Sequence, residues 1–457
     1  MKKTDLLVIG GSAGGILSAN TAKKAYGNIN VTLIRDTDSV MVPCGIPYIF
    51  GTLGDTKKNV IPDGAVTSNG VELIIDRVTK IDRTAKIVET RDGLSVQYKK
   101  LVIATGSLPV VPKFIPGHDL ENVYPVLKNE DYLAEVYEKA KASENVVIVG
   151  GGFIGVEFAE QMKMLGKNVT LVELADACLW QAFDKQYTDE IEAQMTENGI
   201  VVKTGTKIEK ILGDGKVNGV QIDSGETLPA DLVILGMGVK PNSELAKDAG
   251  LEINNQGAIV VDQYTRTSDH DIFAVGDCAS KQCFFTGENA PVLLASTAAT
   301  EAKIAGCNAF QLRLIRQNKG TISAFSTKIF GTTYAAAGMT EAKAEKSGFS
   351  MMIGEFETLD KHPGSLPNAR KTKIKLIFSK CSGVILGAQI SGGDSVGEMI
   401  NILSLAIQKD LTASELNTFQ VATHPLISAS PIAYPINAAA MNAISKNCGH
   451  LNEGFEI

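Results

Sequence analysis

The sequence lacks the features expected of a membrane protein or a nucleic-acid-binding protein. Its apolar runs are short, and even the apolar segment 290–299 is soon interrupted by Glu301 and Lys303, whereas a helix that crosses a bilayer needs about 18 apolar residues. Basic residues are not in excess, because 44 Lys and Arg stand against 51 Asp and Glu and give a net charge of -7. We therefore expect neither a membrane span nor binding to nucleic acid.

Histidine and cysteine are also scarce. The 5 histidines and 7 cysteines never cluster at the spacing of metal ligands, so we expect no metal site. An odd number of scattered cysteines is typical of a reducing compartment rather than of a disulfide framework. The start Met1-Lys2-Lys3 resembles a signal peptide, but glycines from Gly10 onward interrupt its apolar region. We expect a cytoplasmic protein.

Glycine, in contrast, is abundant, with 44 residues against 15 prolines, and twice it follows an apolar run. Residues 6–9 are typical of a buried strand, and a helix over about 14–25 and a second strand over 31–34 follow. The same order returns at 146–149 and ends with a strand at 169–172. Each repeat has the pattern of a βαβ unit. The predicted fold class is therefore α/β, with two Rossmann-like dinucleotide-binding domains.

The second glycine turn carries the stronger signature. Gly150, Gly152 and Gly155 have the spacing that allows a tight turn, close approach of a pyrophosphate and packing of the helix on the strand. Glu173 ends the next strand, where a carboxylate can accept hydrogen bonds from both hydroxyls of an adenosine ribose. Because a carboxylate repels a 2'-phosphate, this unit is predicted to prefer NADH over NADPH. The alternative is a turn that needs its glycines for packing alone.

The first glycine turn fits the same pattern with two exceptions. Ser12 replaces the middle glycine between Gly10 and Gly15. When the two units are aligned, Arg35 stands where the ribose-binding acid is expected. Asp36 follows directly and is the alternative partner for the ribose. The residues themselves leave open which of the two serves.

Two further strand ends point to a flavin. Residues 101–106 run from an apolar strand into a turn of small residues, and residues 272–277 end at a carboxylate, Asp277. A buried carboxylate needs a hydrogen-bond partner, and a ribityl hydroxyl of a flavin is suitable. The alternative is that Asp277 caps a following helix. A helix that begins near Ala295 would direct its N-terminal dipole at the flavin and stabilise an anionic reduced ring.

Together these motifs resemble the pyridine nucleotide-disulfide oxidoreductase family. The resemblance rests on residues 10–15, 104–106, 150–157 and 267–277, and it covers nearly the whole chain. It implies an enzyme that binds FAD at the first unit and NADH at the second, and that forms a homodimer. The implied segments are a FAD-binding domain in two parts (1–112 and 256–322), an NAD(H)-binding domain (113–255) and a C-terminal mixed α/β dimerisation domain (323–457).

The candidate cofactor-binding residues combine the motif positions with those that the resemblance implies. They are Gly10, Ser12, Ala13, Gly14, Gly15, Arg35, Pro43, Ala104, Thr105, Gly106, Gly276, Asp277, Ala295, Gly150, Gly152, Phe153, Ile154, Gly155, Glu173 and Gly238. The last third of the chain has no nucleotide motif. It has the runs 372–378 and 384–390, which are typical of a β-hairpin and favour a role in packing or dimerisation.

Cys44 sets the branch of the family that the chain resembles. Dithiol members carry two cysteines separated by four residues, but the corresponding positions here are Ser39 and Ile49. The stretch 42–51 resembles the single-cysteine branch, which contains coenzyme A-disulfide reductases, persulfide or polysulfide reductases, NADH oxidases and NADH peroxidases. A cysteine at the start of a helix beside a flavin has its thiolate favoured by the helix dipole, which makes it a nucleophile. The alternative is a buried structural cysteine.

Two departures bear on the electron acceptor. Peroxidases of this branch have a histidine in the first glycine turn, where this chain has Ala13, so a peroxidase is disfavoured. His424 resembles the histidine that dimeric members send toward the partner's active site, but Ala429 stands where dithiol reductases place a glutamate. A role for His424 in protonating a leaving thiol and a purely structural role both remain open.

The predicted reaction passes electrons from NADH through FAD to Cys44, and on to a small disulfide such as coenzyme A disulfide or to a persulfide or polysulfide. One alternative is an NADH oxidase that reduces oxygen through a sulfenic acid at Cys44. An alternative of another class is a reductase that passes electrons to a protein acceptor, for which Cys44 would be dispensable.

Overall fold

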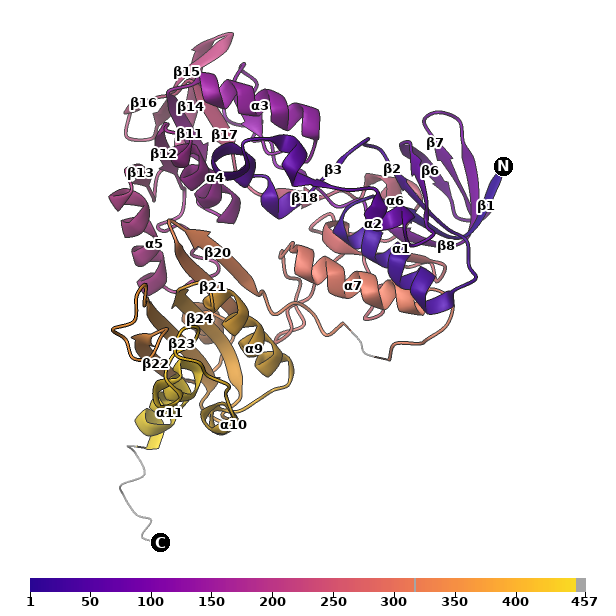
Figure 1. Ribbon diagram of the computed structural model, residues 1–457. Helices are drawn as coiled ribbons and strands as arrows, with labels where there is room; N and C mark the ends of the chain where they lie inside the picture. Colours follow the sequence, from indigo (N-terminus) through magenta and orange to yellow (C-terminus); the bar gives the residue numbers. More distant parts are fainter. Residues whose placement is uncertain (316–317, 449–457) are drawn as a thin grey trace. The chain divides into compact units, whose positions relative to one another are not determined.

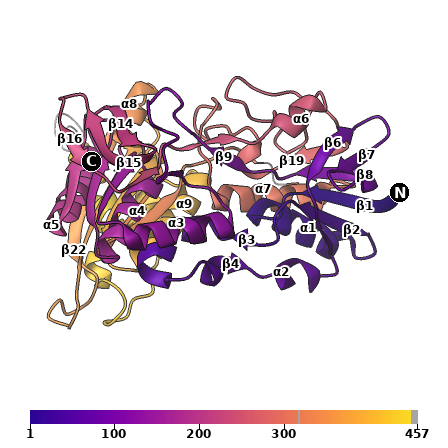
Figure 2. The ribbon, with the colours of Figure 1, turned by 90° about the horizontal axis from the view of Figure 1, so that it is seen from above.

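The computed structural model describes residues 1–315 and 318–448. The chain forms two compact units, each defined by the contacts among its own residues, and we describe them one at a time (Figure 1, Figure 2). The first unit consists of residues 1–146, 210–219 and 229–321, and the second of residues 147–209, 220–228 and the described residues from 322 onward. Among the described residues, no helix combines the length and the apolar character that a membrane span requires.

The strands of the first unit are β1 (Lys2–Ile9), β2 (Val31–Arg35), β3 (Val40–Met41), β4 (Val60–Ile61), β5 (Glu72–Ile75), β6 (Val78–Asp82), β7 (Ile87–Thr90), β8 (Ser95–Ile103), β9 (Ser107–Pro109), β10 (Val123–Pro125), β17 (Leu232–Leu235), β18 (Val239–Pro241) and β19 (Ile272–Ala274). Its helices and short helical turns are α1 (Ala13–Tyr26), η1 (Pro43–Gly45), η2 (Ile49–Leu53), η3 (Thr56–Asn59), α2 (Gly64–Thr67), α3 (Glu130–Ala142), α6 (Glu244–Asp248), η4 (Gly276–Cys278) and α7 (Ala295–Asn308). Four strands lie at the boundaries of the units: β11 (Asn145–Val149), β14 (Ile208–Asp214), β15 (Lys216–Ile222) and β16 (Thr227–Pro229).

The main sheet of the first unit has the strand order β5-β2-β1-β8-β7-β6, with β19 beside β8. Strand β1 pairs in parallel with β2 and with β8, so that Leu7 lies between Thr32 and Leu101. Leu6, Leu7 and neighbouring apolar residues of β1 are completely buried, as expected for a parallel strand covered on both faces. Helices α1 and α7 lie side by side (Figure 1). The predicted first βαβ unit is confirmed by β1, α1 and β2.

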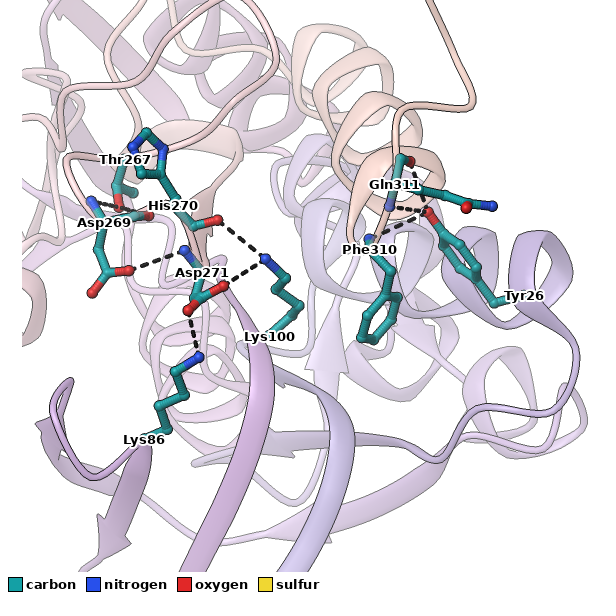
Figure 3. A network of polar contacts seen from close by, with 9 residues as sticks. All are labelled: Tyr26, Lys86, Lys100, Thr267, Asp269, His270, Asp271, Phe310 and Gln311. Carbon is teal, nitrogen blue, oxygen red and sulfur yellow. Dashed lines mark hydrogen bonds and ion pairs between the residues drawn. The ribbon is translucent and has the colours of Figure 1, made fainter.

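Two polar networks hold β19 and α7 in the first unit (Figure 3). The carboxylate of Asp271, just before β19, accepts hydrogen bonds from Lys100 of β8 at 2.5 Å and from Lys86. Both hydrogen bonds lower the pKa of Asp271, and the one from Lys100 has the larger effect.

The second network lies at the end of α1. The hydroxyl of Tyr26 donates to the carbonyl of Cys307 at 2.6 Å and accepts from the amide of Phe310 at 3.3 Å. The two networks fix the strand and the helix between which the candidate residue Asp277 lies in the sequence.

The helices of the second unit are α4 (Phe153–Met164), α5 (Lys185–Glu197), α8 (Glu341–Lys346), α9 (Val396–Gln408), α10 (Ala413–Thr418), the short turn η5 (Pro431–Ala433) and α11 (Pro435–Cys448). Its strands are β12 (Asn168–Val172), β13 (Ile200–Lys203), β20 (Phe325–Ile329), β21 (Thr332–Gly338), β22 (Met351–Leu359), β23 (Lys371–Ser379) and β24 (Ile385–Gly392).

The second unit contains the second nucleotide-type segment and the C-terminal sheet. Strand β12 pairs in parallel with β13, with Val169 opposite Ile200, and it covers the predicted strand 169–172. The C-terminal sheet has the antiparallel order β20-β21-β24-β23-β22, and helices α9 and α11 pack on it (Figure 1). The predicted hairpin is confirmed by β23 and β24, in which Ile374 lies opposite Ile390 and both are buried.

Candidate functional site

The first glycine turn is so tight that two of its residues must be glycine. Gly10 has φ +113°, and a Cβ atom there would lie 2.1 Å from the carbonyl oxygen of Ala104. A Cβ atom on Gly15 would lie 1.9 Å from the carbonyl oxygen of Gly10, so α1 begins in contact with the end of β1. Ser12 is the N-cap residue of α1, and its side chain makes no capping hydrogen bond. The amide end of α1 is thus presented beside half-buried Ala13 and buried Gly14, and this arrangement favours an anionic ligand.

Arg35 faces protein groups in the first unit. Its guanidinium donates to the carbonyl oxygens of Thr37 at 2.8 Å and Asp38 at 2.6 Å, and it lies 2.7 Å from the carboxylate of Asp63. The aliphatic part of the side chain covers Gly11, where a Cβ atom would lie 2.7 Å from Arg35 Cδ. Arg35 therefore forms part of the wall of the turn, and the adjacent Asp36 is the exposed carboxylate.

Asp277 is oriented by groups that the sequence did not reveal. Its carboxylate accepts a hydrogen bond from the hydroxyl of Ser107 at 2.7 Å, and Lys128 Nζ lies 3.5 Å from the same oxygen. The side chain of Asp277 is 20% exposed. It lies within the short turn η4, whose N-cap residue is Val275, so the alternative in which Asp277 caps a following helix is wrong. The carboxylate is held at the surface of the unit, where it can accept from a ligand hydroxyl.

A buried ion pair supports the turn that carries Asp277. Glu301 of α7 and Lys281 are separated by 3.1 Å, and their side chains are 1% and 3% exposed. Glu301 accepts from the amide of Gly276 at 2.8 Å, and Lys281 donates to the carbonyl of Gly276 at 2.6 Å. Burial raises the pKa of Glu301, and Lys281 and the Gly276 amide oppose that shift. The ion pair of Lys281 and Glu301 therefore holds both the amide and the carbonyl of Gly276.

Helix α7 begins at Ala295, as predicted, after the N-cap residue Leu294, which cannot cap it with a side-chain hydrogen bond. Ala295 is exposed. The other predicted strand end is also open, because Gly106 has φ +71° and a Cβ atom there would meet nothing within 4 Å. Beside it, Thr105 donates its hydroxyl to the carbonyl of Asn242 at 2.5 Å. These positions are available to a ligand of the first unit.

Cys44 is exposed on the short helical turn η1, directly after half-buried Pro43. The alternative of a buried structural cysteine is therefore wrong. The amide of Gly45 donates to the carbonyl of Val42 at 3.0 Å. The turn is only three residues long and is followed by the π-helical turn η2, so Cys44 does not begin a regular α-helix. The helix dipole that was expected to act on Cys44 is correspondingly small.

Asn59 anchors the Cys44 turn from a separate stretch of chain. Its side-chain amide donates to the carbonyl of Val42 at 3.0 Å, and its own carbonyl accepts from the amide of Val42 at 2.8 Å. A Cβ atom on Gly45 would lie 1.9 Å from the Asn59 side-chain oxygen. Asn59 is 4% exposed. No sequence motif marked this residue, because its partners are more than ten positions away.

The second glycine turn lies in the second unit and is complete. Gly150 has φ +105°, and a Cβ atom on Gly155 would lie 1.8 Å from the Gly150 carbonyl oxygen. Gly152 is the N-cap residue of α4, and a Cβ atom there would meet nothing within 4 Å. The Glu173 carboxylate accepts from the amide of Gly151 and, at 2.7 Å, from the amide of Ala175. The acid is thus fixed beside an open helix N-terminus, which is the geometry that a dinucleotide requires.

Phe153 and Ile154 begin α4. The ring of Phe153 stacks on Phe325 with centroids 5.0 Å apart, and Ile154 is 37% exposed. Further along α4, burial raises the pKa of Glu157 to about 7, and Thr327 donates to its carboxylate at 2.8 Å. Glu157 lies within the motif 150–157, but no feature of the sequence indicated a role for it. In the first unit, Gly238 has φ +84° with open space at its Cβ position.

His424 is an exposed residue of the second unit. Its amide donates to the hydroxyl of Ser428 at 2.9 Å, and its ring Nδ1 lies 3.3 Å from the amide of Leu426, from which it accepts. A neutral ring that accepts at Nδ1 carries its proton at Nε2.

The second unit also has a surface cavity of about 550 Å³. It is lined by Glu190, Lys373 and neighbouring residues, and no predicted site residue lines it.

Comparison with known proteins decides the family. Residues 4–302 match the model of the pyridine nucleotide-disulphide oxidoreductases, and residues 324–432 match the dimerisation domain of that family. The chain belongs to this family. The predicted resemblance is therefore confirmed, and so is the fold class with a C-terminal dimerisation domain.

Relatives of similar length carry different names. An NADH oxidase of Methanocaldococcus jannaschii is 30% identical over 450 residues, which cover 96% of this chain and 98% of that protein. An NAD(P)H coenzyme A polysulfide/persulfide reductase of Pyrococcus horikoshii is 32% identical over 399 residues, which cover 86% of this chain and 88% of that protein. The solved structure of an NAD-dependent persulfide reductase from A. fulgidus has a TM-score of 0.89 and 33% identity, and the match covers 97% of this chain and 84% of that chain.

As a pyridine nucleotide-disulphide oxidoreductase, the chain is an FAD-dependent enzyme that uses NADH. The residues of the first unit fit FAD. The N-terminus of α1 can hold a pyrophosphate, Gly106 leaves open space, and Asp277 offers a partly exposed carboxylate to a hydroxyl. The residues of the second unit fit NADH, because Gly152 opens the N-terminus of α4 and Glu173 is fixed next to it.

Replacing Glu173 by glutamine in this oxidoreductase is expected to weaken discrimination against NADPH. A glutamine cannot accept from both backbone amides, and it no longer repels a 2'-phosphate. We expect KM for NADH to rise about 10- to 100-fold, as for the loss of one or two hydrogen bonds to a charged group, while KM for NADPH rises less. The ratio of kcat/KM for the two nucleotides measures the effect. The exposed Glu197→Gln is the control, and an unchanged ratio in the Glu173 variant would contradict the assignment.

Proposed function

We propose that this NADH-dependent flavoenzyme reduces a small disulfide, such as coenzyme A disulfide, or a persulfide or polysulfide, through Cys44. The observation that carries the proposal is the exposure of Cys44 on an anchored turn, in the same unit as the candidate FAD-binding residues. Cys178, Cys278 and Cys283 are buried. The names of relatives as persulfide reductases support the same chemistry.

The proposed reaction has two balanced steps. The Cys44 thiolate attacks one sulfur of the disulfide, so that a mixed disulfide forms, the original sulfur–sulfur bond breaks and one thiolate leaves. Two electrons from NADH then cleave the mixed disulfide, which yields the Cys44 thiolate, a second free thiolate and NAD⁺ with one proton. Bound FAD supplies the two-electron relay between the nicotinamide and the sulfur. Overall, one disulfide, one NADH and one proton give two thiols and NAD⁺.

His424 is the proposed source of a proton for a leaving thiolate. A neutral imidazole is too weak an acid to protonate a thiolate, so the proposed donor is the imidazolium form of the His424 ring. We also propose a homodimer, which the dimerisation-domain match supports. Ile427 and Ile432, which follow His424, are 72% and 95% exposed, and apolar side chains this exposed favour contact with another subunit.

Reduction of oxygen is the second candidate function, because several relatives that match over nearly their whole length are named NADH oxidase. Stopped-flow oxidation of the NADH-reduced enzyme separates the two. We expect coenzyme A disulfide or polysulfide to reoxidise the enzyme at least about tenfold faster than air-saturated buffer at equal concentration, because Cys44 attacks sulfur directly. Faster reoxidation by oxygen than by every sulfur acceptor would contradict the proposal and favour the oxidase.

A further inference from the structure

Lys375 of β23 is a buried, charged residue in the second unit. Its side chain is 5% exposed, and its Nζ lies 2.9 Å from a carboxylate oxygen of Asp184 and 3.0 Å from one of Glu341. Burial by itself would lower the pKa of Lys375, but the hydrogen bonds to the two carboxylates raise it above the ordinary value. An apolar residue can replace a buried ion pair at little or no cost in stability. We therefore expect Lys375 and its two carboxylate partners to have a role beyond packing.

Asp184 is the residue that this cluster immobilises. The Gln389 side chain of β24 donates to its carboxylate at 2.6 Å and accepts from its backbone amide at 2.8 Å. The amide of Glu341 donates to the other carboxylate oxygen at 3.0 Å. Asp184 is the N-cap residue of α5, so the C-terminal sheet holds the point at which the loop 173–184 ends.

The other end of the loop 173–184 is tied to the second glycine turn. Glu173 accepts from the amide of Gly151, and the amide of Leu179 donates to the carbonyl of Gly151 at 2.9 Å. A Cβ atom on Gly151 would lie 2.8 Å from the sulfur of Cys178. The loop thus spans from the proposed NADH turn to the buried Lys375 cluster.

The loop carries exposed apolar side chains beside the glycine turn. Leu174 is 69% exposed, and Trp180, the single tryptophan of the chain, is 54% exposed. Leu179, directly before Trp180, has φ +56°, so the backbone there is held in a left-handed conformation that only a fixed loop maintains. Exposed apolar groups next to a nucleotide turn form a surface that the nucleotide can cover.

We propose that Lys375 is a positioning residue for NADH: through Asp184 it fixes the loop 173–184 against which the nucleotide binds. The inference rests on the proposed placement of NADH at Gly150. Without the lysine ammonium, the carboxylate of Asp184, which is 11% exposed, loses the positive charge that it shares with the 39% exposed Glu341. The loop then samples other conformations, and the apparent affinity for NADH falls in proportion to the fraction of molecules that keep the binding conformation.

The test is Lys375→Met in the FAD-loaded enzyme. Binding of the non-reducing analogue 1,4,5,6-tetrahydro-NADH is followed by quenching of Trp180 fluorescence, and NADH turnover is measured with ferricyanide, an acceptor that does not need Cys44. We expect about a tenfold rise in Kd for the analogue and in KM for NADH, with kcat within about twofold of the parent enzyme. Since neither readout involves a sulfur acceptor, an error in the proposed acceptor would leave this result unchanged.

Three variants complete the experiment. Lys371→Met removes an exposed lysine from the same strand, where it pairs with Glu357 at 2.8 Å, and we expect no change in Kd. Lys375→Arg keeps the charge and is expected to keep the affinity. Gln389→Leu removes a tie to Asp184 without leaving a buried charge, and it should raise Kd in the same direction even if Lys375→Met folds poorly. A lower melting temperature with unchanged Kd in both the Lys375→Met and Gln389→Leu enzymes would overturn the proposal.

Discussion

Cys44→Ser is expected to lower NADH-dependent reduction of coenzyme A disulfide or polysulfide by at least about 1,000-fold, as for the loss of an enzyme's nucleophile. A serine hydroxyl is not ionised near neutral pH and forms no bond to sulfur that two electrons could cleave. Cys44 is not among the proposed FAD- and NADH-binding residues, so NADH oxidation by ferricyanide should stay within about twofold of the parent enzyme. The ratio of the two activities is the measurement.

Cys381→Ser is the matched control for this experiment. Cys381 is also exposed, but it lies in the turn between β23 and β24 of the second unit. Its replacement should leave both activities unchanged. A Cys44→Ser enzyme that still reduces the sulfur acceptor at the parent rate would contradict the proposed chemistry. If it instead transfers electrons from NADH to a ferredoxin-like protein at the parent rate, the reductase for a protein acceptor becomes the better assignment.

Glu301→Ala is expected to have the largest effect on stability, a loss of about 3–5 kcal/mol, which is typical when one partner of a buried ion pair is removed. The change leaves the Lys281 ammonium buried without its carboxylate and the amide of Gly276 without its acceptor. Because Gly276 precedes Asp277, FAD should also dissociate more readily from the variant. Chemical denaturation monitored by circular dichroism, together with the FAD content after gel filtration, measures both effects.

The surface substitution Lys303→Ala on the same helix is the control, and it should change stability by less than about 0.5 kcal/mol. The double variant Lys281→Met/Glu301→Met removes both charges, so it should recover most of the stability that the single variant loses. A loss below about 1 kcal/mol in Glu301→Ala would mean that the pair is solvated like a surface ion pair.

The elements and motifs that repeat locally could be predicted from the sequence. The strand–turn–helix order around Gly10 and around Gly150 depends on apolar runs and glycine spacing within about 30 residues, and the structure has these elements where they were expected. The hairpin of β23 and β24 also followed from a local alternation. Family membership followed from the combination of these short motifs.

Contacts between distant parts of the chain could not be predicted in this way. Lys281 and Glu301 bear no periodic relation, and neither residue looks unusual until the fold buries both. The same holds for Lys375, which is one of several lysines in an alternating strand but the one whose charge the interior encloses. Arg35 was recognised as an exception to the motif, but its partner Asp63 lies 28 positions away, in a stretch without any motif.

The anchoring of the Cys44 turn by Asn59 has a consequence for redesign. Val42 makes both of its bonds to Asn59 with backbone atoms, while its side chain is 39% exposed two positions from the cysteine. The backbone of Val42 therefore holds the turn that carries Cys44, while its side chain forms part of the exposed surface beside the cysteine. We expect substitutions at Val42 to change the size and polarity of that surface, and with them the preference for an acceptor, without removing the backbone hydrogen bonds that hold the turn.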